Sequence, residues 1–204
     1  QIARIDTISR DPIGQFIQAA LMQRLQTHID STDAILISDY QNGLLTSNVI
    51  TLVKQINRGN KPVIVDTQGA LDKYHGVDVI KCNADDAAQF LNTSLETNED
   101  FAGAARELAL QLSVKTAVVI TRGSDGATLA TQDAAAYVNA PDVSDVYDTV
   151  GAGDTWIAVM TLAMIAGADL ADAALLANVA SGIVVRHVGN YTPSPAELLA
   201  ALSE

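Results

Sequence analysis

A short glycine-rich string that ends in an aspartate is the part of this sequence best suited to chemistry. Residues 148–154 read Asp-Thr-Val-Gly-Ala-Gly-Asp, and an apolar stretch with helical spacing, 154–165, follows directly. Small residues at the start of a helix let free backbone N–H groups converge on an anion, and the helix dipole adds to the attraction. The string therefore predicts an anion-binding loop at a helix N-terminus.

The aspartate at the end of this loop needs a separate explanation, because its charge would repel a bound phosphate. Its position makes sense if the Asp154 carboxylate faces an acceptor hydroxyl and takes its proton during phosphoryl transfer. The amides of Gly151, Ala152 and Gly153 would meanwhile stabilise charge on the transferred group. The alternative is a glycine-rich turn in which Asp154 only caps the helix. The complete seven-residue string ahead of an apolar helix favours the chemical interpretation.

Short apolar runs alternate with helical patterns in the elements that must position this loop. The expected strands are 34–38, 62–66, 77–81 and 115–121, and the expected helices are 13–29, 47–57, 85–91, 99–112, 154–165, 169–188 and 196–202. Asp125-Gly126 marks a turn, after which 127–131 can form a hairpin with the fourth strand. The alternation predicts an α/β fold with a mostly parallel sheet and helices on both faces.

In folds of this class, ligands bind beyond the carboxyl ends of the strands. Asp39, Asp66, Asn83 and Gly123 each follow an expected strand closely. We therefore expect a cleft at that edge of the sheet.

Composition narrows the classes of partner. The formal net charge of −12 argues against sequence-independent binding to nucleic acid or to an anionic membrane, which requires clustered Lys and Arg. The single cysteine, Cys82, allows no disulfide within the chain, which fits a reducing, cytoplasmic compartment. The longest apolar stretch, 156–166, is too short to span a bilayer. The chain opens on Gln1 rather than Met, which suggests a preceding segment.

The string 148–154 resembles the signature of the ribokinase (PfkB) family of carbohydrate kinases. Segment 121–126 looks like that family's nucleotide-contacting strand end and turn, 83–86 is similar to its Asn-x-x-Glu motif, and 177–180 matches its helix beside the adenine. Segments 38–43 and 65–69 look most like the ADP-heptose-pathway kinases, which phosphorylate a heptose phosphate. The resemblance covers nearly the whole chain and corresponds to the C-terminal two-thirds of the family's domain.

The resemblance implies one three-layer ribokinase-like domain over residues 1–204, without the family's N-terminal part and lid. It implies ATP-dependent transfer of a phosphoryl group to a hydroxyl of a sugar or sugar phosphate, with Mg²⁺ as the metal. The roles that it implies are a catalytic base and anion hole at Asp154, Gly151, Ala152 and Gly153; nucleotide contacts at Thr121, Gly123, Gly126 and Asn178; a Mg²⁺–phosphate network at Asn83 and Asp86; and the substrate end of the cleft at Asp39 and Asp148.

Three positions depart from the family pattern. Asp86 stands where the motif has Glu, and Asn42 and Gln68 stand where the heptose-phosphate kinases carry lysines. The alternative function is therefore a catalytically incomplete nucleotide-binding remnant or scaffold of the same fold.

Two further expectations stay open. Segment 182–192, with Asp148 and Val150, could hold a monovalent cation through backbone carbonyls, as in some family members, or could be a plain loop between helices. Family members often dimerise through the lid sheet, so a homodimer is one possible state.

Overall fold

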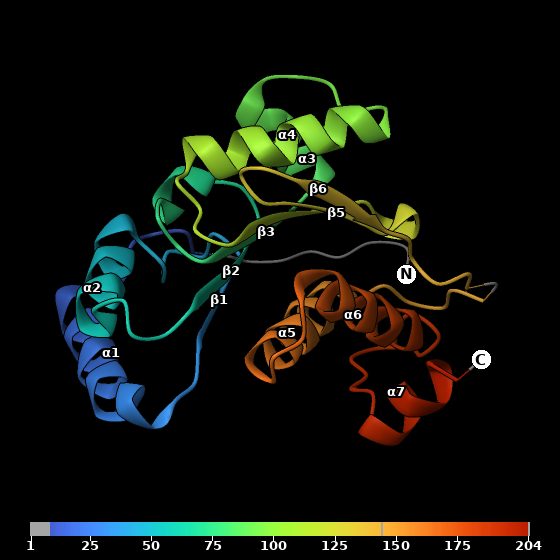
Figure 1. The fold of residues 1–204 in the computed structure, drawn as a ribbon. Coiled ribbons are helices and arrows are strands. Elements are labelled where there is room, and N and C mark those ends of the chain that lie inside the picture. Colours follow the sequence, from blue (N-terminus) through green and yellow to red (C-terminus); the bar gives the residue numbers. More distant parts are fainter. Residues whose placement is uncertain (1–8, 144, 204) are drawn as a thin grey trace.

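The computed structural model describes residues 9–143 and 145–203, and its strands form one six-stranded sheet in sequence order (Figure 1). Four strands run parallel: β1 (Ile35–Asp39), β2 (Val63–Thr67), β3 (Val79–Asn83) and β4 (Ala117–Thr121). Two more continue the sheet antiparallel: β5 (Ala127–Ala130) and β6 (Ala135–Val138). The carboxyl ends of the four parallel strands therefore share one edge of the sheet.

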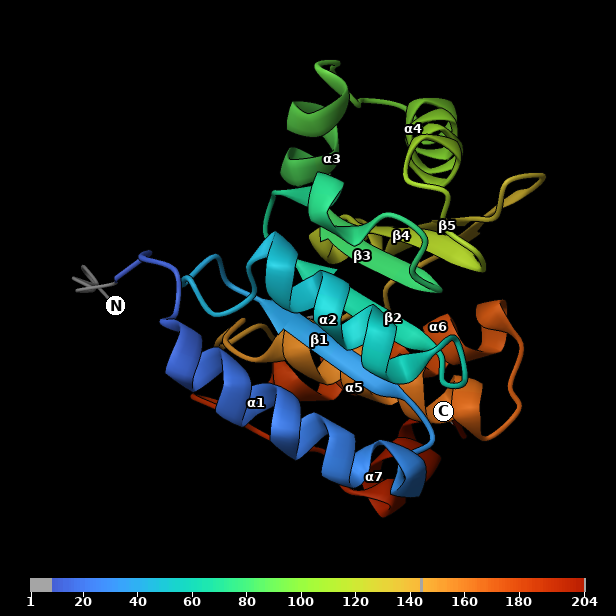
Figure 2. The same cartoon turned by 90° about the vertical axis from the view of Figure 1, so that its left-hand side faces the viewer.

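Helices cover both faces of this sheet and make three layers. One face carries α1 (Gln15–His28), α2 (Ser47–Asn57), α3 (Ala84–Leu91) and α4 (Asn98–Gln111), and the other carries α5 (Ala152–Ile165) and α6 (Leu170–Val184). The last helix, α7 (Pro195–Ala201), packs against α6. Figure 1 shows α3 and α4 above the sheet and α5 and α6 below it, and Figure 2 shows α2 over the front of β1 and β2.

The central strands β2, β3 and β4 are largely apolar on both faces because each face meets a layer of helices, whereas Leu36 on the edge strand β1 is partly exposed. On β2, Val63 and Val65 belong to the core under α1–α4, whereas Ile64 belongs to the core against α5 and α6. All three side chains are buried. The near-continuous apolar runs were the basis for predicting a mostly parallel sheet, and that fold class is confirmed.

The sequence-based element bounds differ from the structure at a few places. The strand expected at 77–81 runs from Val79 to Asn83, and the helix expected at 154–165 begins at Ala152. The helix expected at 169–188 ends at Val184, because the carbonyl of Val185 accepts hydrogen bonds from the loop before α5 instead. Strand β6 was not predicted. Its Ala-Ala-Tyr-Val sequence is mostly exposed and therefore lacks the apolar run that marked the other strands.

A buried carboxylate fastens the end of β1 to the segment that follows β2. Asp39 accepts hydrogen bonds from Lys73 Nζ at 2.6 Å, from Tyr74 Oη at 2.6 Å, and from the backbone and side-chain amides of Gln41, each at 2.9 Å. Burial by itself would raise the pKa of Asp39. The hydrogen bonds from Lys73, Tyr74 and Gln41 outweigh burial and hold that pKa below its usual range. The ionised form of Asp39 therefore stabilises the fold.

The turn between β4 and β5 requires a glycine at one position. Gly126 has φ of +84°, and a Cβ there would lie 2.1 Å from the carbonyl oxygen of Val138 and 2.5 Å from the amide nitrogen of Ala140. Both atoms are backbone and cannot rotate away. The close approach brings residues 138–140 against the start of β5.

Replacing Asp39 by Asn should destabilise the protein by about 3 kcal/mol at pH 7, because Lys73 loses its buried partner. The pKa of Asp39 is lowered in the folded protein, so its contribution is complete above the unfolded value of about 3.9 and disappears as pH falls through the folded value. The difference in urea unfolding between D39N and wild type should therefore begin to shrink below about pH 4 and vanish only below the folded pKa of Asp39. The exposed Asp33→Asn is the control, with little effect at any pH. A D39N difference that did not change with pH would contradict this account.

Replacing Gly126 by Ala should cost more than about 3 kcal/mol of stability, because backbone strain adds to a backbone clash. Gly123→Ala is a matched control, since Gly123 also has positive φ, +58°, but nothing lies within 4 Å of a Cβ there. It should cost only about 1–2 kcal/mol. Urea midpoints of the two variants measure the difference, and equal losses would show that the contact with residues 138–140 is absent.

Candidate active site

The glycine-rich string forms the loop before α5 and the first turn of that helix. Gly151 is the N-cap with φ of +81°, a left-handed conformation that favours glycine. Ala152, Gly153 and Asp154 follow as the first helical residues. The Ala152 amide donates to the carbonyl of Thr149 at 3.3 Å and is engaged within the loop. The amides of Gly153 and Asp154 have no helical acceptor four residues back, so they are available to an anion, and the helix dipole adds positive potential. The glycine-rich string therefore lies at a helix N-terminus as expected, and anion binding there stays a prediction.

A pocket of about 540 Å³ lies between the end of β4, the start of α5 and the middle of α6. Apolar side chains supply much of its wall, among them Pro141, Val143, Val146, Trp156 and Val185. Its volume and mixed apolar and polar lining suit a small ligand. The predicted site residues that line it are Thr121, Gly123, Gly126, Ala152, Gly153 and Asn178.

Asn178 supports the pocket wall through hydrogen bonds inside the protein. Its Oδ1 accepts from the indole N–H of Trp156 at 2.6 Å, and its Nδ2 donates to the carbonyls of Val138 and Asn139 at 3.1 and 2.9 Å. The side chain is buried and fixes the 138–140 segment relative to α5 and α6. Direct contact between Asn178 and a nucleotide base stays a prediction.

Two side chains that the sequence did not single out meet the first turn of α5. The phenol of Tyr40 donates a hydrogen bond to Asp154 Oδ1. Lys81 is buried, with its Nζ 2.8 Å from Asp66 Oδ1 and 3.6 Å from where a Cβ on Gly153 would lie. An ammonium group thus lies beside the first turn of α5, where it adds positive charge next to the helix N-terminus.

A signal for Lys81 was present in the sequence. It lies within an apolar run that was expected to be a buried strand, and a buried charge requires a partner or a ligand. The partner could not be read from the sequence, because Lys81 and Asp66 are neighbours only through the register of β2 and β3. Burial raises the pKa of Asp66, although the ammonium of Lys81 opposes that effect.

Asn83 and Asp86 lie together at the start of α3. Asn83 ends β3 and caps α3, since its Oδ1 accepts from the backbone N–H of Asp86 at 2.7 Å. Among the described residues, Asp86 Oδ2 is a buried oxygen without a hydrogen-bond partner. Burial raises the pKa of Asp86, and the amides of Asn83 and Gly69 oppose it. A carboxylate oxygen in this state suits a hard cation or a water bound to one.

These donors fit Mg²⁺ only as part of a larger shell. No group of three His, Cys, Asp or Glu side chains suited to a metal exists in residues 9–143 and 145–203. Mg²⁺ is commonly held by one or two carboxylates together with substrate phosphates and water. Asp86, with Asn83 beside it, meets that requirement.

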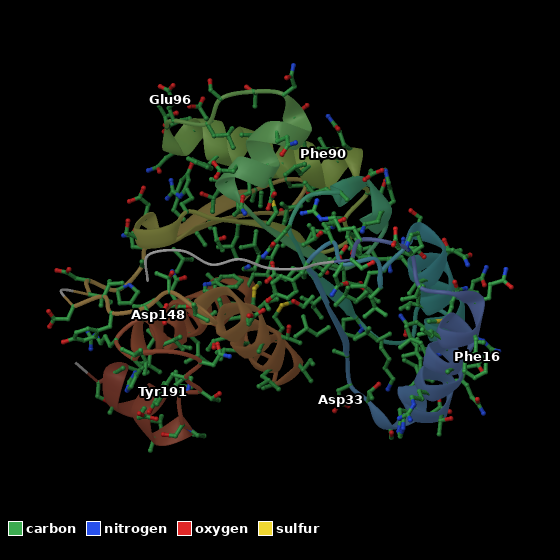
Figure 3. All side chains as sticks on the ribbon, turned by 180° about the vertical axis from the view of Figure 1, so that it is seen from behind. Phe16, Asp33, Phe90, Glu96, Asp148 and Tyr191 are labelled. Atoms are coloured by element: carbon green, nitrogen blue, oxygen red, sulfur yellow. The ribbon has the colours of Figure 1, made fainter. Side chains whose placement is uncertain are left out.

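Asp148 has its oxygens engaged within the protein. Oδ1 accepts from the Val150 amide and Oδ2 from the Gly189 amide, both at 3.0 Å, and these bonds hold the pKa of Asp148 below its usual range. They join the loop before α5 to the segment after α6. Figure 3 shows Asp148 on the side of the molecule formed by α5–α7, away from Phe16 on α1. The substrate contacts expected of Asp148 and of the buried Asp39 stay predictions.

The sequence matches one family model along most of its length. The model described as pfkB family carbohydrate kinase covers residues 5–197. Bifunctional protein HldE of Geobacter sulfurreducens is 37% identical over 204 residues, which is 99% of this chain and 41% of the relative. HldE of Trichlorobacter lovleyi is 36% identical over 206 residues, 100% of this chain and 42% of the relative. The chain therefore spans about two-fifths of the length of these relatives.

Solved structures with the same fold are more distant in sequence. Phosphofructokinase-2 from Escherichia coli in complex with substrates and products superposes with a TM-score of 0.75 at 22% identity, over 89% of this chain and 61% of that one. Arabidopsis thaliana ribokinase complexed with ribose and ATP superposes with a TM-score of 0.77 at 20% identity, over 95% of this chain and 61% of that one.

Within the described ranges, no helix has both the length and the apolar character needed to cross a membrane. By the family match over residues 5–197, this chain belongs to the pfkB family of carbohydrate kinases.

Proposed function

We propose that this chain carries the nucleotide site and catalytic base of an ATP-dependent kinase that phosphorylates a hydroxyl of a sugar or sugar phosphate. One observation carries the proposal. Ala152 and Gly153 line the pocket, and Asp154 is the next residue of the same helical turn, bonded to Tyr40 outside the pocket lining. A phosphate chain that leaves the pocket along α5 would therefore end beside the Asp154 carboxylate.

The apolar part of the pocket would take the nucleoside, and the first turn of α5 would take the phosphates. The N–H groups of Gly153 and Asp154 and the ammonium of Lys81 would stabilise negative charge there. A Cβ at Gly153 would lie 3.6 Å from Lys81 Nζ, at ordinary van der Waals contact, so Lys81 lies directly beside this turn. Preorganised donors of this kind account for much of the catalysis in phosphoryl transfer.

The chemical step needs a group to accept a proton. As the acceptor oxygen bonds to the γ-phosphorus and the bond to the β–γ bridging oxygen breaks, the hydroxyl proton passes to Asp154. Asn83 and Asp86 would hold Mg²⁺, directly or through water, and the metal supplies charge neutralisation at the phosphates.

The similarity to HldE over this chain favours a sugar phosphate of the heptose type as acceptor. However, Asn42 and Gln68 stand where two lysines were expected, so two positive charges are missing. Asn42 Oδ1 accepts from the Leu44 amide and is thus occupied in its own loop. The acceptor screen should therefore include neutral sugars as well as sugar phosphates.

Three further expectations stay predictions: a monovalent cation near segment 182–192, a homodimer and a cytoplasmic location.

A nucleotide-binding remnant without turnover is the second candidate. It is favoured by the internal hydrogen bonds of Asp39 and Asp148, which leave few free polar groups at the expected substrate end. The two functions share the pocket and differ only in whether Asp154 meets an acceptor.

Replacing Asp154 by Asn should lower kcat about 10²–10⁴-fold, the range for loss of a general base, and leave nucleotide affinity unchanged. ADP release measured against a panel of sugars and sugar phosphates, with calorimetry for the nucleotide, tests both parts. Near-normal turnover in D154N would remove Asp154 from the role of base. A wild-type chain that binds ATP and phosphorylates none of the panel would support the remnant instead.

A further inference from the structure

Tyr40 reaches the first turn of α5 from a distant part of the sequence. It directly follows β1, and its phenol donates a hydrogen bond to Asp154 Oδ1, 114 residues away. The Tyr40 side chain is 48% exposed, so packing in the core does not explain its orientation. The bond therefore joins the carboxyl end of the sheet to the residue proposed as the base.

The residues on both sides of Tyr40 are fixed by the buried network around Asp39. Asp39 is held by Lys73 and Tyr74, as described above. Gln41 bonds to Asp39 through its backbone and side-chain amides, and its Oε1 accepts from Lys73 Nζ at 3.2 Å. With anchors immediately before and after it, Tyr40 has little freedom to turn away from α5.

Gln41 also carries backbone strain that this network must offset. Its φ is +55°, in the left-handed region that non-glycine residues seldom adopt. Strained residues persist where the surroundings determine them strongly, and they gather at functional sites. Here the strained residue directly follows Tyr40, so the network fixes the backbone on that side of Tyr40.

We propose that Tyr40 is a positioning residue for phosphoryl transfer, whose phenol holds Oδ1 of Asp154 and so turns Oδ2 toward the acceptor hydroxyl. An unrestrained carboxylate would rotate, and each rotation would take the accepting oxygen out of line with the attacking hydroxyl. A fixed carboxylate keeps the reacting atoms aligned, which is a large part of catalysis by positioning. The proposal rests on the function proposed for Asp154.

The groups around the phenol keep it in the donor state. Burial raises the pKa of Tyr40, and the bond to Asp154 raises it further; the negative charge of Asp66 acts in the same direction, and Ser38 acts against it. The phenol therefore remains protonated at neutral pH and donates to the carboxylate. Because Tyr40 does not change charge near pH 7, its effect on the reaction is geometric.

The first test is the kinetics of Tyr40→Phe, which removes the hydroxyl and keeps the ring. We expect kcat to fall about 10- to 100-fold, the equivalent of one hydrogen bond to a charged group, with nucleotide affinity unchanged and acceptor KM changed far less than kcat. Tyr137→Phe is the matched control, since the Tyr137 phenol donates to the carbonyl of Asn98, away from Asp154. It should keep the wild-type kcat.

The second test needs no turnover. Tyrosine ionisation can be followed by ¹³C NMR of tyrosine-labelled protein, with Y40F to assign the Tyr40 signal. Replacing Asp154 by Asn should lower the pKa of Tyr40, because the charged acceptor of its proton is lost. Tyr191, whose phenol bonds to Glu197, is the control and should titrate as before in that variant.

The outcomes separate the two proposals. Normal kcat in Y40F, or a Tyr40 titration that D154N leaves unchanged, would overturn the positioning role and leave the proposed function intact. A loss of acceptor affinity without a loss of kcat would also overturn it, because Tyr40 would then bind substrate rather than orient the base. A wild-type chain without turnover would overturn the proposed function, and the titration would still show whether Tyr40 holds Asp154.

Discussion

The start of α5 lies against the edge of the sheet where the parallel strands end, and the rest of the candidate site depends on this placement. The register of the sheet aligns Asp39 with Thr67, Asp66 with Lys81, and Asn83 with Thr121, so that polar residues from four strands share that edge. The first turn of α5 lies at this edge. Its helix dipole and its backbone amides both attract negative charge, so the arrangement suits an anionic ligand there. The position of this turn is fixed because α5 packs against the face of the sheet that is opposite to α1–α4.

Two ion pairs near this edge, Asp39–Lys73 and Asp66–Lys81, have different surroundings. The ammonium of Lys73 donates to Asp39, Gln41 and the carbonyl of Leu45, so it stabilises the conformation of these segments. Lys81 pairs with the carboxylate of Asp66 and lies beside Gly153. A buried pair gives little net stability by itself because desolvation opposes the attraction. Lys81 is thus better explained by a ligand at α5 than by stability, whereas Asp39 and Lys73 are explained by the conformation of residues 39–41.

Much of this could be predicted from the sequence, for physical reasons. Apolar runs buried on both faces gave the parallel strands, and the glycine-rich string gave the N-terminus of α5, because both signals are local. The contact between Tyr40 and Asp154 is not local, and nothing in either segment indicates the other. Asn178 was predicted near the nucleotide base, but its hydrogen bonds to Trp156 and residues 138–139 depend on packing that no sequence pattern shows. Strand β6 was missed because its partly exposed alanines carry no periodic signal.

The measurement that tests the central claim most directly is the melting temperature of this chain with and without saturating MgATP. If the pocket beside α5 is a nucleotide site, ligand at about 100 times its dissociation constant adds ~2.7 kcal/mol to the folded state. For a chain of this length that corresponds to a rise of roughly 5–11 °C. We predict a rise of that size with MgATP and a smaller one with ATP and EDTA. An unchanged melting temperature would show that the pocket does not bind the nucleotide and would contradict the account.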